Sequence, residues 1–123
     1  MTVLQIFDKV NLFAPVEQRD FFSHLNASIA EVAALHGDSP GLVFHGNLTS
    51  ADLVPIDTLS GEEKIPLLPL YHDALADNIL YLCGRDAALK SEFLRKTDEA
   101  FRQYWSINAK GRKIRRKGGW QLV

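Results

Sequence analysis

The sequence of 123 residues contains a single cysteine and no long apolar run, and both absences limit the kind of protein that it encodes. Cys83 has no second cysteine to pair with, which excludes an intrachain disulfide and a cysteine-based zinc ribbon. No run of about 18 or more apolar residues exists that would span a membrane. The first residues also lack the basic start and apolar stretch of a signal peptide. With 46% hydrophobic residues, one globular domain is expected.

Sequence patterns typical of catalysis are also missing. No phosphate-binding glycine loop, no dinucleotide-binding fingerprint, no nucleophile elbow and no H-E-x-x-H metal pattern occurs. The one tight group of histidine and carboxylates is His72 with Asp73 and Asp77. On a helix the two aspartates share a face, where they can hold a cation or simply meet water, and a structural or surface role is favoured. We therefore predict no enzyme, no cofactor and no metal, with Cys83 as a small buried hydrophobe rather than a nucleophile.

Acidic residues are absent after position 99, and this divides the chain by charge. Residues 1–109 hold 15 acidic and 8 basic residues, a net charge of −7, whereas residues 110–123 hold six basic residues and no acid. Such asymmetry within a small chain suggests an arm that reaches away from an acidic body. We therefore predict two parts, a helical domain over 1–109 and a basic C-terminal arm over 110–123.

The apolar spacing predicts a small all-α bundle of three to four helices. Apolar positions three and four residues apart indicate helices over residues 15–36, 69–84 and about 87–109. Residues 3–10 fit a short helix, although a strand is possible over so short a run, and a turn is expected at 11–14. Gly37 and Gly84 are natural helix stops, and Asp86 is a plausible N-cap for the last helix.

Residues 38–64 change character and predict a long central loop. Glycine and proline interrupt any helix there, and 42–44 and 53–54 are short β-prone pieces that a turn at Gly46-Asn47 would join into a small hairpin. Loops of this length in compact domains are usually functional or mobile, so a binding loop and a plain connector are both open. If it is a binding loop, its candidate contact residues are Leu42, Phe44, His45 and Asn47.

The C-terminal segment carries the sharpest signal. Six basic residues within residues 110–117 repel one another, and phosphates or an acidic protein surface would stabilise them. Trp120 follows two glycines and precedes Leu122, as an apolar anchor on an arm would. A protein-docking arm is favoured over a nucleic-acid-binding arm and over a solubilising tail. The candidate partner-binding residues are Lys110, Arg112, Lys113, Arg115, Arg116, Lys117, Trp120 and Leu122.

Three patches, in this order, resemble the head–tail connector (adaptor, or head-completion) proteins of tailed bacteriophages. Residues 21–33, F-F-S-H-L-N-A-S-I-A-E-V-A, are similar to the family's L-N-x-A-x-x-E-I-A helix. Residues 65–82, I-P-L-L-P-L-Y-H-D-A-L-A-D-N-I-L-Y-L, are similar to its L-P-x-x-Y-x-D-A-L-x-D-Y-x-L-Y-R-A helix. The third patch is the long last helix with Phe93, Phe101 and Tyr104. The resemblance spans most of residues 15–109, while Cys83-Gly84-Arg85 departs from the family's Arg-Ala continuation and the central loop has no matching motif.

This resemblance implies a non-enzymatic structural subunit of a ring, usually of about twelve copies, that docks under the portal and lines the DNA exit channel. The implied partners are the portal protein, neighbouring copies of the chain, tail or nozzle proteins and the DNA that passes through, with no membrane. The implied location is the head–tail interface of the virion, after synthesis in the host cytoplasm. The alternative from the residues alone is a small nucleic-acid-binding module that uses its basic arm.

Overall fold

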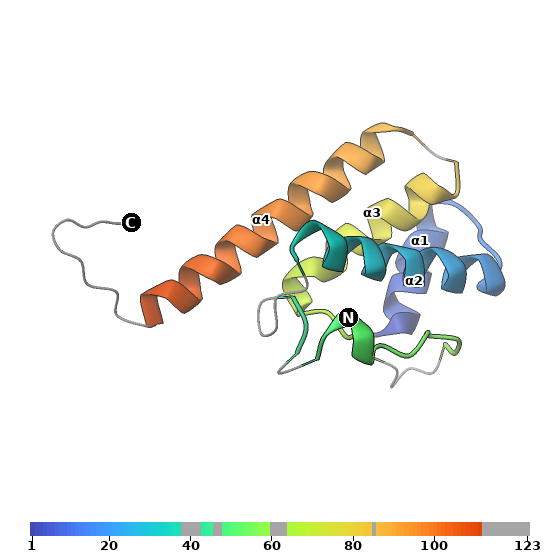
Figure 1. Ribbon diagram of the computed structural model, residues 1–123. Helices are drawn as coiled ribbons and strands as arrows, with labels where there is room; N and C mark the ends of the chain where they lie inside the picture. The colour runs from blue at the N-terminus through green and yellow to red at the C-terminus, as the bar shows by residue number, and fades with distance from the viewer. Residues whose placement is uncertain (38–42, 46–47, 60–63, 85, 112–123) are drawn as a thin grey trace, which may run out of the picture.

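A computed structural model describes residues 1–37, 43–45, 48–59, 64–84 and 86–111, with only the backbone described for 105–111. Over these residues the fold is all-α, as the sequence predicts, with four α-helices packed into a small bundle (Figure 1). The helices are α1 (Val3–Phe13), α2 (Gln18–Leu35), α3 (His72–Leu82) and α4 (Ala88–Gly111), with short 3₁₀ helices η1 (Ser50–Asp52) and η2 (Pro69–Tyr71).

Helix α3 is the centre of the bundle, because α1, α2 and α4 all pack against it. Its apolar side chains are buried on more than one side: Leu75, Ile79 and Ala74 are fully buried, and Leu80 is almost so. Large side chains from α2 and α4, such as Phe21 and Phe93, complete one continuous core. A helix that is covered on several sides depends on the whole fold for its stability.

Helix α1 resolves the choice between helix and strand that the sequence leaves open. Thr2 caps its first turn, because the Thr2 hydroxyl accepts from the Gln5 backbone N–H and the Gln5 side chain accepts from the Thr2 N–H. The helix continues to Phe13, so the turn predicted at residues 11–14 is wrong for its first three residues. The Asn11 side chain donates to the Phe7 carbonyl one turn back, which lets this turn-favouring residue stay in the helix.

Helix α2 begins at Gln18, three residues after the predicted start at Pro15. Residues 15–17 stay outside the helix, and the Val16 N–H donates to the side chain of Asn11 at 3.1 Å. The predicted stops are confirmed, since Gly37 and Gly84 follow α2 and α3 with φ of 68° and 88°. The predicted helix over 69–84 is present as η2 followed by α3, with the prolines at its entrance.

Helix α4 is the longest element, and its C-terminal half extends beyond the rest of the bundle (Figure 1). The Asp86 carboxylate accepts from the Ala88 N–H at 2.9 Å, the predicted cap at the start of this helix. The helix then runs to Gly111, two residues past the predicted boundary at 109, so the first residues of the predicted arm are helical. Residues 112–123 lie outside the described part of the chain.

The predicted hairpin in the central loop is not formed by the described residues, none of which lies in a strand. Phe44 instead makes an isolated antiparallel bridge with Leu67, and the Leu68 N–H donates to the Val43 carbonyl at 3.1 Å. Val43, Phe44 and Leu67 are all fully buried. The loop therefore satisfies its backbone against the segment that leads into α3, because this placement also buries two large apolar side chains.

The buried position of Leu25 on α2 gives a test of this core. Leu25→Ala should lower the free energy of unfolding by about 2–5 kcal/mol, because it removes buried methyl groups and leaves a cavity. Leu12→Ala is the matched control, since Leu12 on α1 is 83% exposed and its loss should change stability by no more than about 0.5 kcal/mol. Urea unfolding followed by circular dichroism measures both, and equal effects would contradict the helix packing described here.

Candidate functional site

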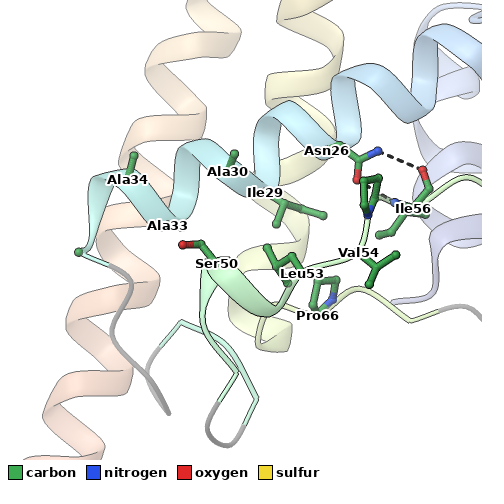
Figure 2. Close-up of a pocket in the computed structure, with 12 residues that line it drawn as sticks. Asn26, Ile29, Ala30, Ala33, Ala34, Ser50, Leu53, Val54, Ile56 and Pro66 are labelled. Atoms are coloured by element: carbon green, nitrogen blue, oxygen red, sulfur yellow. Dashed lines mark hydrogen bonds between the residues drawn. The ribbon is translucent and has the colours of Figure 1, made fainter.

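The clearest concave feature is an apolar groove of about 510 Å³ between α2 and the segment that runs from η1 to Ile56 (Figure 2). We call it the α2 groove. Helix α2 forms one wall with its small side chains, and Leu53, Val54 and Pro55 form the other. Its full lining is Asn26, Ile29, Ala30, Ala33, Ala34, Gly37, Ser50, Leu53, Val54, Pro55, Ile56 and Pro66.

Asn26 holds the second wall against α2. Its side-chain amide donates to the Ile56 carbonyl at 3.0 Å, and its side-chain oxygen accepts from the Ile56 N–H, also at 3.0 Å. The same amide donates to the Phe22 carbonyl at 2.9 Å within α2. At the other end of the wall, Asp52 accepts from the backbone and the hydroxyl of Thr49, which closes η1. The Asn26 contacts therefore fix the Ile56 end of the wall against α2, and the Thr49–Asp52 bonds fix the local shape of η1.

The chemistry of the α2 groove is that of a binding surface. None of its lining residues carries a titratable side chain, so it offers neither an acid nor a base. Alanines at 30, 33 and 34 leave room beside the helix backbone, and Val54 is 81% exposed on the rim. Grooves of this size and polarity bind apolar groups, with affinity from buried area rather than from charge.

His72, one member of the predicted His/carboxylate group, is buried. Its Nε2 bonds the Leu67 carbonyl at 2.9 Å, and its Nδ1 lies 2.7 Å from the N-terminal amine of Met1. Burial lowers the pKa of His72, because the charged ring would lose water and face the positive amine. Because the Leu67 carbonyl and the Met1 amine occupy the two ring nitrogens, His72 has a structural role.

Asp73 and Asp77 each pair with a lysine instead of converging on one point. Asp73 bonds Lys9 of α1 at 2.9 Å, a contact that lowers the pKa of its carboxyl, and Asp77 pairs with Lys96 of α4 at 2.7 Å. Within the described ranges, no three His, Cys, Asp or Glu side chains gather as they would around a metal ion. These carboxylates join α3 to its neighbours, in keeping with the structural role favoured from the sequence.

A buried polar cluster, which the sequence did not reveal, connects α2, α3 and α4. The Asn78 amide donates to the Ser28 hydroxyl at 2.8 Å and to the Glu31 carboxylate at 3.3 Å. Lys90 donates to the Asn78 side-chain oxygen at 3.1 Å and pairs with Glu31. The Lys90 ammonium also lies 4.9 Å from the centre of the Phe93 ring. Ser28 and Asn78 are fully buried, so this cluster satisfies groups that would otherwise lose water.

The residues predicted as loop contacts separate into different environments. Phe44 is fully buried in the core, where it cannot reach a partner, and His45 beside it is exposed. Leu42 and Asn47 lie outside the described residues. Cys83 is half-buried against the core and not fully buried as predicted, because it falls just after α3 ends.

The predicted arm residues lie almost wholly beyond the described chain. Lys110 belongs to the last turn of α4, and only its backbone is described. Arg112, Lys113, Arg115, Arg116, Lys117, Trp120 and Leu122 lie outside the described residues.

Comparison of the chain with protein-family models, with curated proteins and with solved structures finds no match. Among the helices of the described residues, none combines the length and the apolar character needed to cross a membrane. The function must therefore be argued from the residues and their arrangement.

Loss of Asn78 should show how much the polar cluster contributes. Asn78→Ala removes hydrogen bonds to Ser28 and Lys90 and leaves a buried hydroxyl with one partner fewer, so we expect the free energy of unfolding to fall by about 1–3 kcal/mol. Gln103→Ala, an exposed change on α4, is the control. Chemical unfolding measures both variants, and a neutral Asn78→Ala would show that the cluster adds nothing to stability.

The buried His72 and the half-buried His36 predict a loss of stability in mild acid. Burial lowers the pKa of both His36 and His72, so between the lowered value and the ordinary value of 6.5 the unfolded chain binds more protons than the folded one. The free energy of unfolding should therefore decrease as the pH falls below about 6.5. His72→Gln should flatten this dependence in urea unfolding at pH 7.5, 6.5 and 5.5. An unchanged slope would mean that His72 takes up its proton equally in both states.

Proposed function

We propose that the protein is a structural, non-enzymatic subunit of a phage head–tail connector ring. In this proposal, the ring docks under the portal and lines the channel through which DNA leaves the head. The order of the three resembling patches supports it, and so does the fold, in which two of those patches become the packed helices α2 and α3. The connector location in the virion, with portal, tail or nozzle proteins and neighbouring copies as partners, follows from the same resemblance.

The observation that carries the proposal is the geometry of α4. The helix has 24 residues and a length of roughly 36 Å. Its first half packs on the bundle, and its second half extends beyond it (Figure 1). Among the α4 side chains that the structure describes, which end at Tyr104, the fully buried or nearly buried ones are Phe93, Thr97 and Ala100, and Phe101 and Tyr104 are only partly buried. The described end of α4, at Gly111, therefore lies away from the body, where a following segment could reach a separate ring.

The charges of the body support a channel wall that does not hold DNA. Its basic side chains are largely neutralised by ion pairs, and the pairs run from Lys9 to Asp73, Lys90 to Glu31, Arg95 to Glu92 and Glu99, Lys96 to Asp77 and Arg102 to Asp98. Exposed carboxylates without an ion pair among the described residues remain, including Asp8, Glu17 and Asp57. An acidic surface of this kind repels phosphates at short range.

A second candidate function is nucleic-acid binding through the arm. Six basic residues within 110–117 favour it, since each can neutralise one phosphate. If all six engaged duplex DNA, the logarithm of the binding constant would fall with a slope of about −5 against the logarithm of the salt concentration.

Two variants separate these functions. Trp120→Ala should abolish binding to portal rings, because it removes the apolar anchor, while a triple change of Arg112, Arg115 and Arg116 to Ala should weaken it less. Pull-down against portal rings and against duplex DNA, at low and moderate salt, measures both. Binding to DNA alone that collapses as salt rises, with the triple variant the more affected, would overturn the connector proposal in favour of the second function.

A further inference from the structure

The α2 groove leaves apolar side chains uncovered at the surface of the bundle. Its rim exposes Val54 by 81%, and Ala30 and Ala34 of α2 are exposed beside it (Figure 2). Extended apolar grooves on small soluble domains usually mark interaction sites. The occupant can be identified from the length of the chain beyond α4, from its composition and from the charges beside the groove.

The chain beyond α4 supplies an apolar group of suitable kind. Trp120 and Leu122 stand two residues apart, so on an extended chain both side chains point to the same side. Gly118-Gly119 precede them and permit a tight bend. A tryptophan and a leucine are large flat or branched groups, whereas the groove wall on α2 is built from alanines that leave space for them.

The distances allow this segment to reach the groove of its own chain. The His36 ring, at the end of α2, stacks on Phe101 of α4 with 4.3 Å between ring centres. Gly111 lies ten residues further along α4, roughly 15 Å by helix rise, and the nine residues from there to Trp120 span at most about 30 Å. That length covers the return along α4 and the width of α2, about 10 Å.

Charge favours the same placement. Asp52 and Asp57 flank the second wall of the groove, are exposed, and form no ion pair among the described residues. Arg116 and Lys117 stand only four and three residues before Trp120, so they would come near the rim carboxylates as Trp120 enters the groove. Opposite charges at the rim of an apolar contact fix the orientation of binding and raise the association rate more than they raise the affinity.

We propose that the α2 groove is a binding site for the chain's own C-terminal segment, with Trp120 and Leu122 as its anchors. Attachment to the same chain gives the segment an effective concentration in the millimolar range, so it outcompetes the segment of another copy at ordinary protein concentrations. This inference goes beyond the proposed function, because the groove contact does not depend on which partner the arm meets later. In a connector it would hold the anchor until a better partner displaces it.

Tryptophan fluorescence of the full chain tests the proposal directly. The sequence has two tryptophans, so Trp105→Phe leaves Trp120 as the only reporter. In that background we expect a blue-shifted emission and an acrylamide quenching constant roughly twofold or more below that of free tryptophan, since most chains are docked when the effective concentration exceeds the dissociation constant. Circular dichroism and thermal unfolding check that each variant is folded.

Two groove variants and one matched control locate the contact. Ala30→Arg and Ala34→Arg place a bulky cation in the groove wall and should each red-shift Trp120 and restore full quenching. Ala27→Arg adds the same charge to an exposed α2 position outside the groove lining and should leave the signal unchanged. The proposal would be overturned if Trp120 were fully quenched in the Trp105→Phe protein, or if Ala27→Arg exposed Trp120 as much as the groove variants do. It would also be overturned if the protection of Trp120 from quenching rose with protein concentration, because the groove would then bind the segment of a neighbouring copy.

Discussion

Burial of α3 is the constraint on which the rest of the structure depends. Three helices cover it, so a polar group on one of its buried faces reaches little water and must find its partner inside the protein. Asn78 does so through Ser28 of α2 and Lys90 of α4, and His72 through the backbone of Leu67. Hydrophobic burial alone tolerates sliding of one helix on another, whereas these directional contacts allow only one arrangement of α2 and α4 around α3.

That arrangement determines where α4 points. Lys90 and Lys96 contact α3 from positions six residues apart on α4, and His36 of α2 stacks on Phe101 further along. Three contacts between residues 90 and 101 hold this part of the helix, so the rest of α4 continues in a defined direction away from the body (Figure 1). The ion pairs at the surface add little stability by themselves, but together with the buried cluster they orient the segment that follows.

Local sequence signals predicted most of the fold and little of the candidate site. Apolar spacing indicated the helices, and Gly37, Gly84 and Asp86 marked ends that the structure confirms, because caps and periodicity act within a few residues. The hairpin was wrong because Phe44 pairs with Leu67, a distant segment that no local rule identifies. The α2 groove likewise needs Asn26 to hold Ile56, a contact across thirty residues whose only signal was an asparagine on a helix.

Helix α2 is both a core element and one wall of the α2 groove. Phe21, Leu25 and Val32 bury its inner face, so the exposed Ala30 and Ala34 are not needed to fill the core. Alanine at these exposed positions favours the helix, but its methyl groups remain uncovered apolar surface. A chain that exposes such a wall while its own C-terminal segment carries Trp120 and Leu122 must either cover the wall or leave both surfaces exposed to water. If that segment covers the wall, the apolar surface of the groove and the apolar side chains of the segment leave water together, and burial of both favours the docked state.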